Sequence, residues 1–251
     1  MKIPKGLQPL IEDGMIDTVV RRLKSGKEAS VYIVASGDAR AMRKRGRHGR
    51  TVQEEEWKNS EVQALYRLVS VGVRVPAPYL VHEGVLLMEL VRDRFGNPAP
   101  QLCEVDLTSD QAREWHGFMI GQIVRMLCAG LIHGDLSDFN VLLDAKGPVI
   151  IDLPQAVSAA GNNSALPMLE RDVNNMRAAF GRAAPELLTT EYAREIWKLY
   201  SAGELTPESK LSGRFAEDPT APDVDAVLSQ IEAERREAEA RQRRREAADA
   251  A

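Results

Sequence analysis

The segment Leu-Ile-His-Gly-Asp-Leu-Ser-Asp-Phe-Asn-Val-Leu-Leu, residues 131–143, constrains the fold of this 251-residue chain more than any other. Two aliphatic stretches enclose a polar loop, which holds Asp135 and, five positions later, Asn140. A further aliphatic stretch, residues 149–151, ends directly at Asp152. Short apolar stretches bounded by polar loops are typical of buried strands. The sequence therefore predicts a rigid core that presents two carboxylates and one amide at the ends of neighbouring strands.

These three side chains match the needs of phosphoryl transfer. One carboxylate must accept or orient the proton of the attacking group, and oxygen ligands must hold a divalent metal against the triphosphate. An Asp and an Asn on one loop, with a second Asp after the next strand, supply both functions. His133 alone would be weak support for catalysis, and we expect it to brace the loop.

The N-terminal part alternates between helical and extended patterns. Apolar residues recur at helical intervals from Leu7 to Leu23, so we expect a short lead-in and then one helix. Residues 24–30 form a predicted turn that leads into a strand at 31–35. Such a turn between extended segments can present backbone N–H groups to a phosphate.

A second helix is predicted over residues 52–71, with Glu61 inside it, and the two prolines of residues 73–78 end it. Residues 79–84 and 85–91 then read as a hairpin of two strands. The second strand is almost continuously apolar, which favours burial.

The pattern changes after Val91. A polar connector, residues 92–100, precedes a long helix from Asp110 to about Ala129, with Ser109 as its expected N-cap. Strands dominate before the connector and helices after it, which favours an α+β chain with two lobes. We expect an N-terminal lobe (1–91), a helical C-terminal lobe (92–215) and a charged tail (216–251), partly helical or disordered.

Composition excludes several other classes of protein. The formal net charge of -4 gives no overall preference for nucleic acid or membrane. The two cysteines, Cys103 and Cys128, form no CxxC motif, which argues against a disulfide framework or a structural zinc site. The N-terminus has no apolar region typical of a secretory signal, and no apolar stretch approaches the roughly 20 residues that span a bilayer. We therefore expect a cytoplasmic protein without a membrane partner.

Five segments resemble the RIO family of atypical protein kinases, closest to its type-one branch in its bacterial form. They are the catalytic loop (133–140), the metal-binding segment Ile-Asp-Leu-Pro-Gln-Ala (151–156), the phosphate-binding loop Ser-Gly-Lys-Glu-Ala-Ser-Val-Tyr (25–32), the hinge strand (86–90) and the C-lobe segment Glu-Arg-Asp-Val-Asn (170–174). The resemblance covers about residues 5–200 and implies a two-lobed protein-kinase-like fold.

The resemblance also implies roles for individual residues, with ATP and Mg²⁺ or Mn²⁺ as cofactors. Asp135 would be the catalytic base, and Asn140 and Asp152 the metal ligands. Asp152 would also be able to accept phosphate itself. The nucleotide would be bound by Ser25, Gly26, Lys27 and Ser30 around its phosphates, by the backbone of Glu89 to Val91 at adenine, and beside the gatekeeper Met88.

One feature of the family is abnormal here. Kinases clamp the phosphates with a lysine on the third strand, paired with a helix glutamate, a role that Glu61 can fill. Either Arg43 replaces this lysine, or the strand is missing and the basic block 40–50 is a linker. The second interpretation is favoured because a Gly-rich basic sequence makes a poor strand. Arginine is not equivalent to lysine at a tight phosphate site, so full kinase activity is in doubt.

Three functions follow from these patterns. The leading hypothesis is an ATP-dependent protein kinase or ATPase that acts on an unknown protein, on itself or on water. Few residues separate Asp152 from Arg171, which argues against an ordinary peptide substrate. The alternatives are a small-molecule phosphotransferase, and a nucleotide-binding pseudokinase that associates with RNA or a ribosomal particle through residues 40–50 and 241–245.

Overall fold

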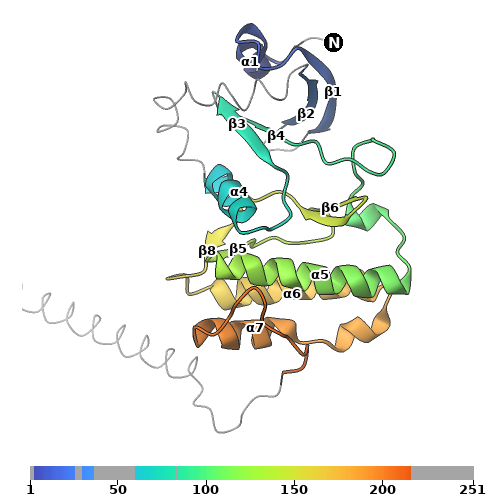
Figure 1. Cartoon of the computed structure of the whole chain (residues 1–251), viewed down its shortest axis with the longest axis vertical. Coiled ribbons are helices and arrows are strands. Elements are labelled where there is room, and N and C mark those ends of the chain that lie inside the picture. Colours follow the sequence, from blue (N-terminus) through green and yellow to red (C-terminus); the bar gives the residue numbers. More distant parts are fainter. Residues whose placement is uncertain (1–2, 26–29, 37–59, 83, 216–251) are drawn as a thin grey trace, which may run out of the picture. The chain divides into compact units, whose positions relative to one another are not determined.

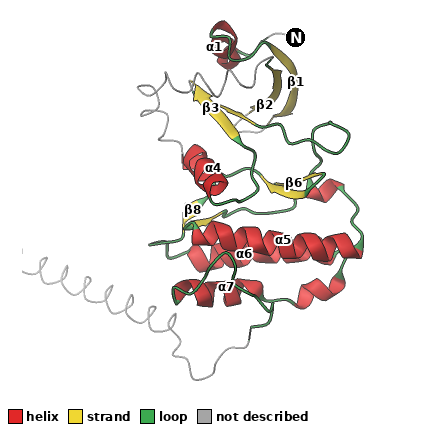
Figure 2. Cartoon of the chain, viewed as in Figure 1, coloured by secondary structure: helices red, strands yellow, loops and turns green. Residues whose placement is uncertain are grey.

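The computed structural model describes residues 3–25, 30–36, 60–82 and 84–215. Strands dominate the first part of this chain and helices the second, as predicted (Figure 2). The basic block 40–50 and the tail 216–251 lie outside the described residues, so the expectations for them stay predictions. No helix in the described ranges combines the length and apolar character that a membrane crossing needs.

The N-terminal part begins with a 3-10 turn, η1 (Lys5–Leu7), and a short helix, α1 (Gln8–Glu12). The antiparallel strands β1 (Thr18–Ser25) and β2 (Ser30–Ala35) follow. The helix predicted to extend to Leu23 is therefore wrong in its second half. The chain leaves the helix at Gly14, whose φ is 64°, and β-branched residues then pair with β2. The apolar spacing fits either structure, and the partner strand decides between them.

The predicted second helix and hairpin are present. The helix α4 (Ser60–Ser70) is followed by a turn at Gly72, whose φ is 76°, while residues 52–59 lie outside the described chain. The strands β3 (Pro78–His82) and β4 (Val85–Met88) pair antiparallel. The expectation of a buried second strand is wrong, because Leu87 is the one buried residue of β4 and the other three are partly buried. In the described chain β4 pairs with β3 alone.

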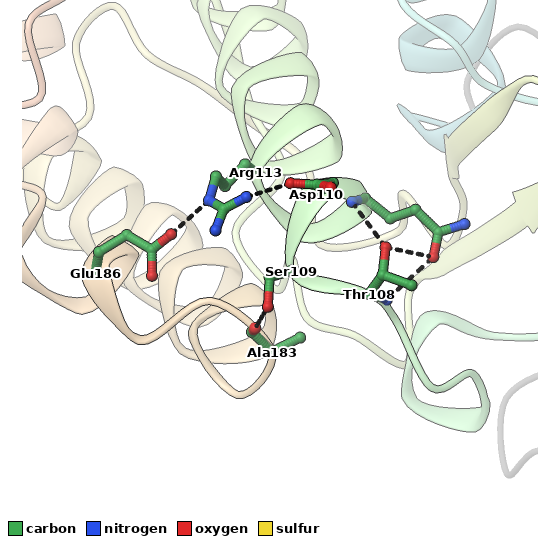
Figure 3. A network of polar contacts seen from close by, with 7 residues as sticks. Thr108, Ser109, Asp110, Arg113, Ala183 and Glu186 are labelled. Atoms are coloured by element: carbon green, nitrogen blue, oxygen red, sulfur yellow. Dashed lines mark hydrogen bonds and ion pairs between the residues drawn. The ribbon is translucent and has the colours of Figure 1, made fainter.

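The long helix α5 (Ser109–Cys128) is capped by Thr108 rather than by the predicted Ser109. The Thr108 hydroxyl accepts a hydrogen bond from Gln111 N (3.2 Å), and Gln111 Oε1 accepts one from Thr108 N (3.0 Å). This reciprocal capping box needs a Gln or Glu three residues after the cap, which Thr108 has. Ser109 Oγ instead donates to Ala183 O at 2.7 Å (Figure 3).

Two short antiparallel strand pairs and two helices complete the C-terminal part, with 3-10 turns at η2 (Leu102–Glu104) and η3 (Pro185–Thr189). The pairs are β5 (Leu131–Ile132) with β8 (Val157–Ser158) and β6 (Val141–Asp144) with β7 (Gly147–Ile150). The helices α6 (Ala165–Gly181) and α7 (Tyr192–Ser201) pack with α5 (Figure 1). The core between them includes Met119, Leu127, Leu136, Leu169, Met176 and Phe180.

Candidate active site

A buried carboxylate on α6 holds the loop that carries Asp135. Asp172 is only 2% exposed, and its two oxygens accept hydrogen bonds from Gly134 N (2.8 Å) and Leu136 N (2.9 Å). Burial raises the pKa of the Asp172 carboxyl, and these two backbone hydrogen bonds oppose the rise. The residue between the two bonded amides is Asp135, whose side chain is exposed. Asp172 thus fixes the backbone on both sides of the predicted catalytic base.

The sequence interpretation included Asp172 in a matched segment but missed this role. A signal was present, because Leu169, Asp172, Val173 and Met176 recur at the spacing of one buried helix face. A carboxylate in such an apolar stripe must find hydrogen-bond donors inside the protein. The glycine-containing loop that precedes the Asp–Asn pair is the part of the chain that supplies them.

Asn140, at the end of the loop, is hydrogen-bonded to Asp135 near its start. Its side chain is 7% exposed, and Nδ2 donates to Asp135 O at 2.9 Å. Its backbone N–H donates to Ser137 O at 3.0 Å, which makes the intervening residues a tight turn. Because the amide nitrogen is committed to Asp135 O, Oδ1 is the atom that Asn140 can offer to a cation.

Two hydrogen bonds join this loop to the segment that ends in Asp152. Ile151 N donates to Asn140 O at 3.0 Å, and His133 Nε2 lies 3.0 Å from Ile151 O. Since Asp135 N donates to His133 Nδ1 (3.3 Å), the ring proton belongs on Nε2, which donates to Ile151 O. His133 is 1% exposed. It braces the loop, as expected from the sequence.

Asp152 has an unusual backbone. Its φ is 68°, and no other non-glycine residue in the described chain has a positive φ. This conformation costs on the order of 1 kcal/mol, and such strain clusters at functional sites. The segment after it lies against the loop, because a Cβ atom on Gly134 would come within 2.7 Å of Gln155 O. Asp152 therefore projects an exposed carboxylate from a tightly constrained position.

Glu61 on α4 reaches the same region. Burial raises the pKa of its carboxyl above the ordinary value, and the negative charge of Asp152 raises it further. The predicted helix glutamate thus lies within electrostatic reach of the predicted metal ligand. Arg43, its proposed partner, lies outside the described residues.

The segment after β4 has the backbone groups expected of a hinge. Glu89 N donates to Ala77 O (2.8 Å), and Val91 O accepts from Ala99 N (3.0 Å). Glu89 O and Val91 N, the groups predicted to meet adenine, take no part in these two hydrogen bonds. Met88, the predicted gatekeeper, ends β4 and is partly buried.

The predicted phosphate-binding loop is only partly described. Ser25 and Ser30 pair with each other at the ends of β1 and β2, while Gly26 and Lys27 lie outside the described residues. Leu23 and Val31, near the same ends, are 41% and 39% exposed. The sequence interpretation gave these two apolar side chains no role in nucleotide binding, although they lie on both sides of the predicted phosphate-binding loop.

The side-chain oxygen atoms of Asn140 and Asp152 suit a hard cation. The described residues include no group of three or more His, Cys, Asp or Glu side chains that could hold a metal. The donor set here is smaller: the Asn140 amide oxygen and the Asp152 carboxylate. Mg²⁺ is commonly held by one or two protein ligands together with substrate phosphates and water, so these residues fit it.

Comparison with known proteins agrees with these features. The RIO domain family model matches residues 21–193. The serine/threonine-protein kinase RIO1 of Homo sapiens is 29% identical over 227 residues, 80% of this chain and 39% of the human protein. The RIO-type kinase Rio1 of Haloferax volcanii is 32% identical over 197 residues, 69% of this chain and 67% of that protein. Rio2 of Methanocaldococcus jannaschii is 29% identical over 199 residues, 68% of this chain and 70% of that protein.

Proposed function

Because this chain belongs to the RIO family of protein-kinase-like proteins, we propose that it transfers the γ-phosphate of ATP to a protein hydroxyl, to itself or to water. The strand-rich first part and helical second part agree with the two-lobed fold of this family. We assign residues 1–91 to the nucleotide-binding lobe and residues 92–215 to the catalytic lobe. The relatives are named serine/threonine-protein kinases, but the chain spans only 39% of the human protein.

One observation carries the proposal: Asp135, Asn140 and Asp152 share a single hydrogen-bonded framework. Asn140 donates to Asp135 O, and Asn140 O accepts from Ile151, the residue before Asp152. The backbone positions of the three residues are therefore set by hydrogen bonds from a buried side chain and between backbone groups. Phosphoryl transfer depends mainly on such positioning and on electrostatic stabilisation.

In this mechanism Asp135 accepts the proton of the attacking hydroxyl group. Asn140 Oδ1 and the Asp152 carboxylate would hold the divalent metal, which would neutralise negative charge on the triphosphate. Glu89 O and Val91 N bind the edge of adenine, and the apolar side chains of Leu23 and Val31 cover its face.

Asp152 can also act as the acceptor. Attack by its carboxylate on the γ-phosphorus would break the bond to the β–γ bridging oxygen, releasing ADP and leaving an acyl phosphate on the side chain. The exposed carboxylate and the strained backbone of Asp152 support this branch. Water would then attack the acyl phosphate and restore the carboxylate, which gives net ATP hydrolysis.

The test is to incubate the purified protein with γ-labelled ATP and Mg²⁺ or Mn²⁺, and to follow both released phosphate and label on protein. Asp135→Ala and Asp152→Asn should abolish both signals. Asp106→Asn, at an exposed aspartate outside the site, is the matched control and should keep them. Label removed by hydroxylamine would identify the acyl phosphate.

Turnover that persists in Asp135→Ala would overturn the assignment of the catalytic base. ATP binding without any turnover in the unmodified protein would overturn the enzyme proposal, and would favour a nucleotide-binding module. A separate binding measurement with Mg²⁺–ATP distinguishes these two results from a misfolded sample.

A further inference from the structure

The outer edge of the catalytic loop, residues 137–140, is held from two sides. From η2 and the residue before it, Cys103 N donates to Asp138 O (3.2 Å) and Gln101 Nε2 donates to Phe139 O (2.6 Å). From the other side, Arg182 Nη2 pairs with Asp138 Oδ2 at 2.6 Å. The Asp138 side chain is only 16% exposed, although that of Arg182 is 62% exposed.

Arg182 continues a row of contacts that α6 makes with this loop. Asp172 accepts from Gly134 and Leu136, and Asn175 Nδ2 donates to Leu136 O at 2.9 Å. With about 100° per residue, position 175 lies about 300° and position 182 about 280° around the helix from position 172. The three residues therefore share one face of α6 and its C-cap, and they meet the loop from its start to its outer edge.

The backbone around Arg182 is itself anchored to the start of α5 (Figure 3). Ser109 Oγ donates to Ala183 O at 2.7 Å, and Arg113 Nε donates to Glu186 Oε1 at 2.5 Å. Arg113 also pairs with Asp110 on its own helix. These contacts fix the residues on the C-terminal side of Arg182, so its guanidinium extends from a rigid base.

We propose that Arg182 is a positioning residue, which acts through Asp138 to set the geometry of the catalytic loop. Asp135 and Asn140 are joined at the two ends of this loop by the Asn140 side chain, so displacement of Asp138 between them moves both. A misplacement of about 1 Å can cost about 100-fold in rate, whereas an ion pair with one exposed partner adds little to global stability. The inference rests on the proposed phosphotransferase function.

The first test compares turnover in four variants. Arg182→Gln and Asp138→Asn should each lower kcat about 5- to 20-fold while the KM for ATP changes less than 2-fold. The double variant should be no slower than the worse single one, because both remove the same contact. Arg182→Lys, which keeps the charge, should recover to within about 3-fold of the unmodified protein.

The matched control is Arg194→Gln, which removes a guanidinium of similar exposure (52%) from its ion pair with Glu170 on α6, away from the loop. Its kcat should stay within 2-fold of the unmodified protein. A kcat for Arg182→Gln equal to that of this control would overturn the proposal. So would single effects that multiply in the double variant.

A second test needs no turnover and separates this inference from the proposed function. Hydrogen exchange measured by mass spectrometry on peptides covering residues 133–143 should be faster in Arg182→Gln than in Arg194→Gln. Unchanged exchange would overturn the positioning role. Faster exchange in a protein that shows no phosphoryl transfer would support the positioning role and overturn only the enzyme proposal.

Discussion

His116 gives a prediction about stability that can be worked from the structure. Its ring lies on α5, is 1% exposed, and packs against Phe180 and Tyr192, with ring centroids 5.9 and 5.7 Å away. Its Nε2 is buried and has no hydrogen-bond partner among the described residues. Burial lowers the pKa of His116 from 6.5 to about 4, and the positive charge of Arg177 adds to the effect. The folded protein therefore disfavours the protonated ring.

Proton linkage gives the direction in which the free energy of unfolding changes with pH. Because the pKa is lowered on folding, the unfolded chain binds the proton more tightly than the folded one between pH 6.5 and about 4. Above pH 6.5 the His116 ring is neutral in both states and does not oppose folding. As the pH falls toward 4, the free energy of unfolding decreases progressively. The shift, at 1.36 kcal/mol per unit, corresponds to a loss of about 3 kcal/mol.

The assay is urea unfolding followed by circular dichroism at steps from pH 7.5 to pH 4, with His116→Leu alongside. Other titrating groups are present in both proteins, so the difference between the two curves isolates His116. The variant should gain about 3 kcal/mol relative to the unmodified protein as the pH falls. At pH 7.5 the two should differ by no more than about 1 kcal/mol, since a buried unpaired polar atom is replaced by apolar volume.

Curves that stay parallel, within about 0.5 kcal/mol over the whole range, would refute the reasoning. An NMR titration of the imidazole protons provides an independent check. A ring that titrates near 6.5 in the folded protein would show that the site admits water or a counter-charge, and the linkage argument would fail with it.

Three further predictions concern the loop. Gly134→Ala should lower the free energy of unfolding by about 2–4 kcal/mol, because the added Cβ would lie 2.7 Å from a backbone carbonyl oxygen. The control is Gly84→Ala. Gly84 has a φ of 75°, close to the 80° of Gly134, but an added Cβ would meet no atom within 4 Å, so the change should cost only about 1 kcal/mol in the same urea assay. Equal losses in the two variants would contradict the steric argument. Asp172→Ala leaves two buried N–H groups unpaired, so it should cost about 2–4 kcal/mol, and a loss below about 0.5 kcal/mol would speak against the bracing role. Burial, and then the charge of Asp138, raises the pKa of the Cys103 thiol. With the other cysteine replaced by serine, Asp138→Asn should therefore speed iodoacetamide alkylation of Cys103 at pH 8 by about 2- to 5-fold, and an unchanged or slower rate would count against this contact.

Local patterns predicted those elements whose structure depends on nearby residues. The spacing of Asp135, Asn140 and Asp152 between aliphatic stretches predicted the β5, β6 and β7 strands and the polar loop, because burial and turn chemistry act over a few positions. The same reasoning failed at β1, where the apolar spacing of residues 15–23 fits a helix as well as a strand. Pairing with β2 decides that case, and periodicity within one segment cannot show it.

The partners of the site residues were the harder part to predict. Asp172 lies 38 positions from Gly134, and Arg182 lies 44 from Asp138. Such contacts depend on how α6 packs against the loop, and local propensity carries no information about that packing. The N-cap of α5 shows the same limit on a smaller scale. Ser109 is a residue type preferred at N-caps, but its hydroxyl donates to Ala183 O and Thr108 caps the helix.

The polar residues of the interior support the proposal that the loop is a functional site rather than an incidental turn. Five polar or charged side chains are buried in the described chain: His116, Gln122, His133, Asn140 and Asp172. Three of the five belong to the framework around Asp135, and the backbone strain of Asp152 lies at the same place. Buried polar groups and strained backbone each lower stability, so an ordinary core would contain neither in such density. Their concentration around two exposed carboxylates indicates that geometry at this loop, rather than stability, has shaped the residues that hold it.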